Sequence, residues 1–106
     1  MKNKYEVIYL PVFYSDLDRI TNYIKYTLRN KIAANKLLDD VYNSINKRAN
    51  NPTSYEEFQS ENSRVEKYYR IYVKNYIVFY VVKDGVMEVR RMVYGASDLE
   101  KIDYDI

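Results

Sequence analysis

Five residues near the C-terminal end of the chain have side chains that could do chemistry together: Arg70, Tyr72, Arg90, Arg91 and Tyr94. Arginine binds phosphate and carboxylate groups through paired hydrogen bonds, and tyrosine rings stack on bases. Together these residues would form a basic, aromatic patch that contacts RNA, DNA or a target protein. The plain structural alternative is that Arg70 and Arg90 are exposed strand residues paired with Glu88.

The composition narrows the chemistry that such a patch could perform. The 106 residues include 14 Tyr but no His, so the usual general base near neutral pH is missing. Any acid–base step would have to use Lys, Tyr, Asp or Glu. There is no Cys either, which excludes disulfides, a thiolate nucleophile and a Cys/His zinc site. We therefore predict no cofactor and no metal.

The candidate residues lie in a stretch, 69–95, that reads as three strands joined by short turns. Its runs of β-branched and aromatic residues suit a pleated sheet, and Asp84-Gly85 is a strong signal for a type I′ hairpin turn. In residues 69–74 apolar and polar side chains alternate, as in a strand with one face in solvent. In residues 76–82 the side chains on both faces are apolar, so this strand should be central and covered on both sides. In residues 86–94 the alternation places one arginine on the apolar face of the strand, unless a β-bulge shifts the register.

The aromatic residues of the central strand have a simpler interpretation. Tyr76, Phe79 and Tyr80 are expected to fill the core, because aromatic residues on a central strand do so far more often than they form sites.

The first third of the chain predicts a strand followed by a helix. Residues 4–10 alternate as a strand, and Pro11 closes it. Ser15 is a candidate cap for a helix over 16–30, with Asp16 in its first turn, where the helix dipole favours acids.

A second helix is predicted over 32–49 after a break at Asn30-Lys31, and the two helices would form an antiparallel hairpin. The polar segment 53–64 is a connector, in which Tyr55 and Phe58 should dock locally. A single helical turn capped by Ser97 is expected over 96–102.

These elements predict an α+β fold in the order β-α-α-β-β-β, in one domain spanning 1–106. The helical hairpin should pack on one face of a twisted antiparallel sheet, with apolar residues such as Ile20, Ile24, Leu38 and Val41 in the core. The other face, near Arg70, Tyr72, Arg90 and Tyr94, is expected to be polar and aromatic.

Charge is unevenly distributed although the net charge is only +2. Residues 19–48 carry seven Lys or Arg against two Asp, and 64–94 carry seven against three acids, whereas 49–63 and 95–106 are acidic. The basic zones could steer an anionic partner or could be ordinary solvated faces. No apolar run is long enough to span a bilayer and no signal peptide is evident, so we expect a cytoplasmic protein without membrane contact.

The element order and the motifs of the last three strands resemble the RelE and ParE toxin superfamily, the toxin halves of type II toxin–antitoxin modules. The resemblance covers almost the whole chain, from Tyr5 to Ile102. Its most specific parts are the strand and turn YRIYVKNY (69–76), the aromatic VFY (78–80), the turn DGV (84–86), and RMVYG (91–95) followed by the acid-Leu pair Asp98-Leu99.

One branch of the superfamily consists of ribosome-dependent mRNA endonucleases. Their chemistry needs a base for the ribose hydroxyl, cations for the developing phosphorane charge and an acid for the leaving oxygen. By resemblance, Arg70 stands where such nucleases have a catalytic lysine. Tyr72 replaces a second lysine, and Ile77 and Ser97 replace arginines. Most of the cationic set is therefore missing.

The ParE-like branch inhibits DNA gyrase and needs no hydrolytic set, so the resemblance favours this branch. Tyr94 stands where many of its members have His. We take Arg70, Arg91 and Tyr94 as candidate catalytic residues, and Tyr72 and Arg90 as candidate target-binding residues. The resemblance also implies a cognate antitoxin that forms a hetero-oligomer with the toxin. The alternatives are an mRNA endonuclease acting on ribosome-bound mRNA, or a non-toxic binding member of the superfamily.

Overall fold

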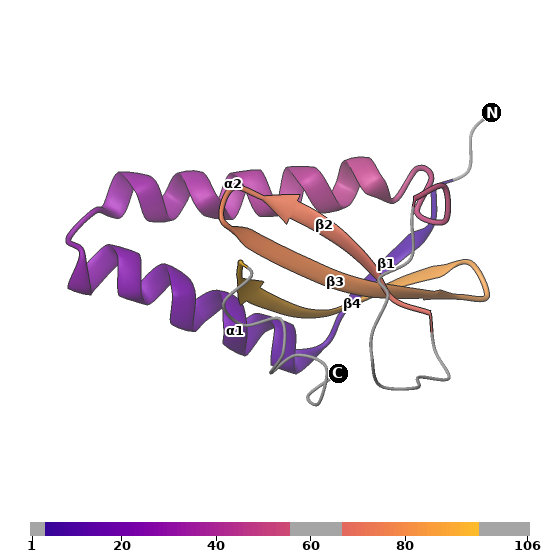
Figure 1. The fold of residues 1–106 in the computed structure, drawn as a ribbon, viewed down its shortest axis with the longest axis horizontal. Coiled ribbons are helices and arrows are strands. Elements are labelled where there is room, and N and C mark those ends of the chain that lie inside the picture. Colours follow the sequence, from indigo (N-terminus) through magenta and orange to yellow (C-terminus); the bar gives the residue numbers. More distant parts are fainter. Residues whose placement is uncertain (1–3, 56–66, 96–106) are drawn as a thin grey trace.

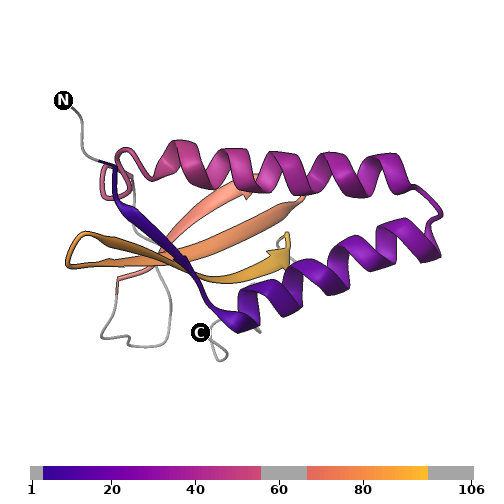
Figure 2. The same ribbon diagram turned by 180° about the vertical axis from the view of Figure 1, so that it is seen from behind.

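The computed structural model describes residues 4–55 and 67–95. Its elements follow one another as β1 (Glu6–Tyr9), α1 (Pro11–Asn22), the π-helical turn η1 (Tyr23–Thr27), α2 (Lys31–Arg48), β2 (Tyr69–Val73), β3 (Tyr76–Lys83) and β4 (Val86–Tyr94). The predicted α+β class and element order are confirmed. Figures 1 and 2 show the two helices running side by side along one face of the sheet.

The sheet is mixed, with strand order β1-β4-β3-β2. The last three strands form the predicted antiparallel meander, but β1 runs parallel to β4, so the prediction of an antiparallel sheet is wrong for this strand. The parallel direction has a physical consequence. The chain leaves Tyr9 beside the middle of β4, opposite Val89, and α1 can then cover the rest of that edge.

The turns of the meander adopt the conformations that their residues favour. Asp84 and Gly85 have φ of 52° and 78°, as a type I′ turn requires, which confirms the predicted hairpin. Lys74 lies at φ 54° in the β2–β3 turn. A β-bulge interrupts the β3–β4 register, because Phe79 pairs with Arg91 while Tyr80 pairs with Val89. Arg90 is the extra residue, and the bulge resolves the conflict of parity in the sequence.

The helix boundaries differ substantially from the prediction only at the first helix, while α2 lies within one residue of the predicted 32–49. The first helix begins at Pro11 rather than at residue 16, with Leu10 at the N-cap, so Ser15 does not cap it. Proline at the first helical position is favourable, because its missing N–H would have no partner there. The break before α2 is confirmed: Arg29 has a positive φ, and the Asn30 side chain accepts from the Ala33 N–H at 3.0 Å.

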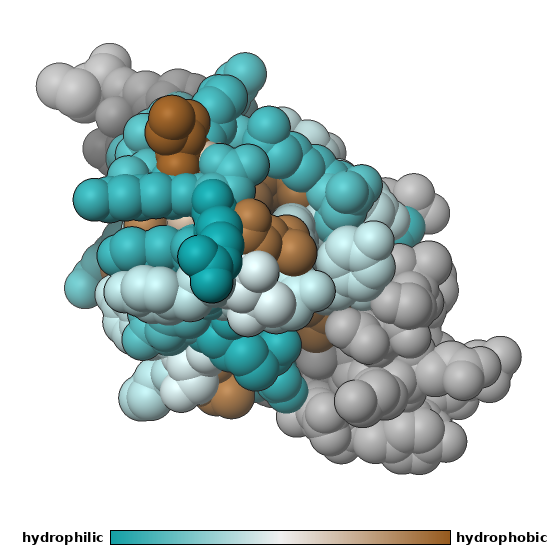
Figure 3. All heavy atoms as spheres, turned by 90° about the vertical axis from the view of Figure 1, so that its left-hand side faces the viewer, coloured by the Kyte–Doolittle hydropathy of each residue, from teal (hydrophilic) through white to brown (hydrophobic). Residues whose placement is uncertain are grey.

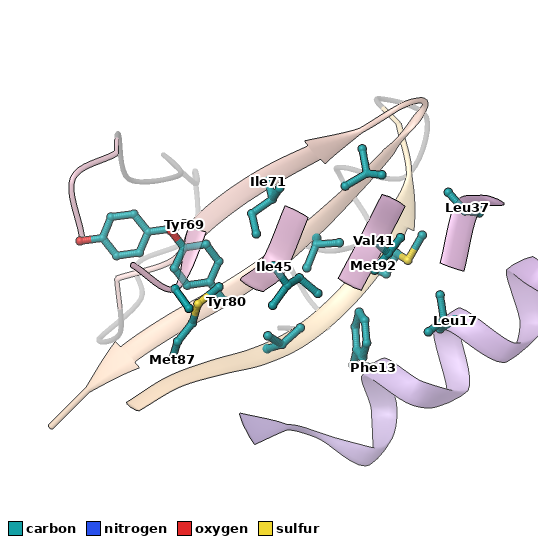
Figure 4. Close-up of a cluster of buried hydrophobic side chains, with 14 of the residues drawn as sticks. Phe13, Leu17, Leu37, Val41, Ile45, Tyr69, Ile71, Tyr80, Met87 and Met92 are labelled. Atoms are coloured by element: carbon teal, nitrogen blue, oxygen red, sulfur yellow. The ribbon is translucent and has the colours of Figure 1, made fainter. Parts of the chain in front are cut away.

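The main core lies between the helices and the sheet (Figure 4). Phe13 and Leu17 of α1 and Leu37, Val41 and Ile45 of α2 pack on the sheet residues Tyr69, Ile71, Val73, Val78, Tyr80, Met87, Val89 and Met92. Of the predicted core residues, Ile20 and Val41 are buried, while Ile24 and Leu38 are partly buried against this cluster.

A second apolar cluster on the opposite face of the sheet contains Tyr68, Ile77, Phe79, Val81 and Val93. The central position of β3 and the core role of Phe79 and Tyr80 are thus confirmed. Tyr76 is partly buried against the main cluster.

Some sequence predictions fall outside the described residues, namely those for Phe58 and for the helical turn over 96–102. Tyr55 is described, and its ring lies 3.5 Å from the Arg48 guanidinium carbon. Among the described residues, no helix is long and apolar enough to cross a membrane.

Candidate functional site

The candidate arginine of β4, Arg91, is held by a carboxylate on α1. Its Nε donates to Oδ2 of Asp16 at 2.8 Å, and its Nη2 donates to Oδ1 at 3.1 Å. The side chains are 17% and 5% exposed, so water screens this paired contact only weakly. The arginine therefore ties the first helix to the last strand across 75 positions of sequence.

The same carboxylate satisfies the backbone of β4. Oδ2 of Asp16 also accepts from the Met92 N–H at 3.0 Å, and Arg19 lies 3.4 Å from Oδ1. β1 ends at Tyr9, so from Arg90 onward β4 has no strand on that side. Asp16 takes the place of a neighbouring strand at this edge of β4. Without it, the buried Met92 N–H would lack this hydrogen-bond acceptor.

Arg90 is also engaged within the sheet. Its guanidinium group contacts Oε1 of Glu88 at 2.6 Å through Nη2, and Nη1 donates to the Tyr68 hydroxyl at 3.0 Å. Of the two arginines that the structural interpretation pairs with Glu88, Arg90 is thus in contact with it. The pair is partly exposed and lies on one strand, so it fixes the guanidinium group but contributes little stability.

Arg70 and Tyr72 lie on β2, the strand at the other edge of the sheet. The Arg70 guanidinium carbon is 5.7 Å from the centre of the Tyr72 ring, within range of a cation–π contact. The Arg70 backbone carbonyl accepts a hydrogen bond from Arg48 at 3.0 Å. Tyr72 is 64% exposed. Tyr72 therefore presents a stacking surface to solvent.

Tyr94 lies at the end of β4, 50% exposed, and meets Tyr76 edge to face with ring centres 5.5 Å apart. Burial, with the neighbouring Tyr94 and Tyr23 adding to it, raises the pKa of Tyr76 above its usual value. The hydroxyl group of Tyr76 therefore stays protonated near neutral pH and is a poor general base.

A groove of about 390 Å³ joins two of the candidate residues, Tyr72 and Tyr94. Its remaining lining residues are Lys74, Asn75, Tyr76, Ile77 and Gly95, and none of the three candidate arginines is among them. Gly95 closes the groove with φ 38°, where an added Cβ would come within 3.1 Å of the Asn75 carbonyl oxygen. The structure thus brings the tyrosines together and leaves the arginines in separate contacts.

A second groove, of about 330 Å³, lies between the β2–β3 turn and the start of α2. Ile24, Leu37 and Tyr76 give it apolar walls, and Lys36 and Lys74 add cations. Both lysines lie 3.4 Å from Asp40. Desolvation raises the pKa of its partly exposed carboxyl group, but the hydrogen bonds and charges of the lysines outweigh it and lower the pKa. Within the described residues, no group of three or more acids could hold a metal ion.

A model of the ParE toxins of type II toxin–antitoxin systems matches residues 7–99 of the chain. The chain belongs to this family. The match includes β1, the helical hairpin and the three-strand meander, which are the elements on which the resemblance rested. A search of curated proteins found no match.

Two solved structures are similar to this ParE-family chain. A chain of the chromosomal ParDE system of P. aeruginosa has a TM-score of 0.71 and 14% identity, covering 87% of this chain and 97% of that one. A chain of the RelB–RelE antitoxin–toxin complex of Methanococcus jannaschii has a TM-score of 0.48 and 19% identity, covering 92% and 95%. At these identities the first likeness supports the fold alone.

Sequence reasoning missed the most important partner in this region, Asp16. It was expected to act in the first turn of a helix, yet it lies inside α1 and is 4% exposed. A signal was present, because Asp16 is three residues after Phe13 and four before Ile20, and so shares the buried face of the helix.

Proposed function

We propose that this ParE-family toxin arrests growth by inhibiting DNA gyrase and is held inactive by a cognate antitoxin. One observation carries the choice of target: two of the three candidate arginines already bind carboxylates of the protein itself. Arg91 is bound by the buried Asp16, and Arg90 by Glu88. Releasing Arg91 toward a scissile phosphate would leave the buried Asp16 carboxylate with only the Met92 N–H and the longer 3.4 Å contact to Arg19, which is unfavourable.

The remaining candidates do not make up a nuclease site. Ribonuclease chemistry needs a base, an acid and cations around one phosphate. The groove that unites Tyr72 and Tyr94 has a lysine but none of the candidate arginines, and its Tyr76 hydroxyl has a raised pKa. A toxin that works by contact with gyrase needs no such set, and the exposed Tyr72 and Tyr94 would serve it as contact residues.

The groove beside α2 suits an antitoxin segment. Its walls are mainly apolar, and Lys36 and Lys74 lie among the lining residues. An amphipathic segment with acidic residues could bury its apolar side here and offer carboxylates to the lysines, folding as it binds. The name of the matched family, ParE toxin of a type II toxin–antitoxin system, supports a partner of this kind.

The second candidate function is ribosome-dependent mRNA cleavage. Arg70 favours it, because this residue stands where the nuclease branch has a catalytic lysine and lies 5.7 Å from an exposed tyrosine ring that could stack on a base. Such an enzyme would work with a reduced catalytic set.

Two assays on purified protein distinguish these functions. The wild-type chain and the Arg70→Ala variant are each added to gyrase with relaxed plasmid, and to translating ribosomes with mapping of mRNA ends. We expect both proteins to inhibit supercoiling and neither to produce codon-phased cuts. Codon-phased cuts by the wild type that disappear with Arg70→Ala would reject the gyrase mechanism. Unchanged growth upon expression without an antitoxin would reject both functions.

A further inference from the structure

The helical hairpin ends in a surface whose charge the proposed function explains only at Lys36. Residues 19–38, here called the hairpin tip, run from the second half of α1 through η1 to the first half of α2. They contain five cations and no acid: Arg19, Lys25, Arg29, Lys31 and Lys36. Figure 3 looks at this end of the molecule and shows mainly hydrophilic side chains around smaller apolar patches.

The cations of the tip are accessible and only partly compensated. Arg29 and Lys31 are exposed, and among the described residues neither forms an ion pair. Arg19 and Lys36 make long contacts of 3.4 Å to Asp16 and Asp40 but keep about two thirds of their side-chain surface exposed. The tip therefore presents a compact positive field.

Two of these cations stand at positions that their own backbone disfavours. Arg29 has φ 54°, a left-handed conformation in which glycine or asparagine is less strained. Lys31 is the first residue of α2, where the positive end of the helix dipole repels a cation, and that first turn contains no acid. Cations at positions where they lower local stability indicate that these side chains serve binding to a partner rather than the stability of the fold.

Aromatic and polar side chains lie among these charges. Tyr23 is 54% exposed and Tyr26 is 65% exposed, with the Lys25 amine 5.1 Å from the Tyr26 ring. The π-helical turn that carries both tyrosines is closed by the Leu28 N–H bonding to the Tyr23 carbonyl at 3.0 Å. Turns of this kind occur often at functional sites.

We propose that the hairpin tip is a docking surface for the sugar-phosphate backbone of duplex DNA, with Arg29 and Lys31 as its central contacts. A phosphate backbone complements a surface built from residues 19–38, which include five cations and no acid, and it needs no apolar groove. The inference goes beyond the proposed function by naming DNA itself as a partner of the toxin. The biological role of this DNA contact rests on the proposed inhibition of gyrase. The contact itself does not, because DNA binding is measured in the absence of gyrase.

The test is the fluorescence anisotropy of a labelled 20-base-pair duplex titrated with the full chain at salt concentrations from 50 to 200 mM. If four phosphates are contacted, log K should fall against log salt with a slope of about −3.6. The variant Arg29→Asn/Lys31→Gln should bind at least about tenfold more weakly, with a slope smaller in magnitude by about 2.

The matched control is Lys4→Gln/Lys47→Gln, which removes two exposed cations at the opposite end of the molecule (Figure 1). It should bind DNA like the wild type. The tip variant should melt at a temperature no lower than the wild type, because asparagine tolerates the left-handed conformation and the first helical turn loses a cation. Loss of DNA binding with retained stability supports a contact role.

Three results would overturn the proposal: no binding at 50 mM salt, equal weakening by the control pair, or competition by poly-glutamate as strong as that by DNA at equal charge. The last result would assign the tip to an acidic polypeptide. Failure to inhibit gyrase would refute the proposed function and leave the DNA result intact, so the two ideas fail separately.

Discussion

The end of β4 and the hairpin tip both carry arginines, but they hold them in opposite ways. The Arg91 side chain is 17% exposed, and two of its nitrogens donate to a buried carboxylate, which also accepts from the Met92 backbone N–H. Arg29 is exposed, in a strained backbone conformation, and outside every ion pair among the described residues. The same residue type thus serves the fold in one place and is available to a partner in the other.

The comparison teaches that a count of cations does not locate a functional site. The sequence places the most suggestive arginines in β4. In the structure Arg91 joins the sheet to α1, and Arg90 binds Glu88 and Tyr68. What distinguishes the tip is that two of its cations, Arg29 and Lys31, stand at positions that are unfavourable for local stability.

Removing the carboxylate at β4 should have the largest effect on stability. Asp16→Ala removes the buried carboxylate from the Arg91 guanidinium and from the Met92 N–H, so the free energy of unfolding should fall by about 3 kcal/mol. Urea unfolding followed by circular dichroism measures this. Asp18→Ala, an exposed acid two residues along α1, should change it by less than about 0.5 kcal/mol. Equal losses of stability in the two variants would show that the Arg91–Asp16 contact does not serve the fold.

A second buried polar contact should give an intermediate effect. The Tyr80 hydroxyl donates to the Pro52 carbonyl at 2.6 Å and accepts from Arg48 at 2.9 Å, which ties the end of α2 to the sheet. Tyr80→Phe should lower the free energy of unfolding by about 1.5 kcal/mol in the same urea titration. Tyr72→Phe, on the exposed side of β2, is the matched control and should be nearly neutral.

Alkaline pH should also weaken the fold through its clustered tyrosines. Burial, together with Tyr42 and Tyr14, raises the pKa of Tyr9 from 10.0 to about 12, so the folded state keeps a proton that the unfolded chain loses. Stability from this group is present below pH 10 and is lost as the pH rises toward 12. Partial exposure limits the loss to about 1 kcal/mol. Tyr9→Phe should flatten the decline in urea midpoint between pH 9.5 and 11.5, and an unchanged decline would exclude Tyr9 as its source.

The smallest effect should have the opposite sign and come from the tip. Lys31→Glu places an acid at the positive end of α2 and should raise the free energy of unfolding by about 0.5 kcal/mol. Lys47→Glu, in the last turn of the same helix, should lower it by a similar amount. Thermal melts of both variants provide the measurement. Destabilisation by Lys31→Glu would show that the lysine serves the fold after all.

Local sequence signals were enough for most of the fold. Asp84-Gly85 predicted a turn because few residue pairs tolerate two positive φ angles, and the alternation in β2 predicted which side faces the core. The parallel pairing of β1 could not be read in this way, because the edge that a strand joins depends on contacts about 80 positions away. Helix α1 was misplaced because Ser15 resembles a cap, although Pro11 is the better start.

The site was less predictable than the fold, since its chemistry depends on distant pairs. Tyr72 and Tyr94 were chosen as residue types, and only the folded chain shows that they line one groove. The bond between Arg91 and Asp16 spans 75 positions and has no signature in either local segment. The structural use of that arginine became apparent only from its geometry.

The most direct test of the proposed gyrase mechanism is supercoiling of relaxed plasmid by purified gyrase in the presence of increasing amounts of the wild-type chain. We predict that supercoiling declines as the toxin exceeds gyrase, and that adding the cognate antitoxin restores it. Full supercoiling at a large excess of correctly folded toxin would contradict the proposed gyrase mechanism. The binding of Arg91 by Asp16 and of Arg90 by Glu88 would then not be evidence for a gyrase inhibitor.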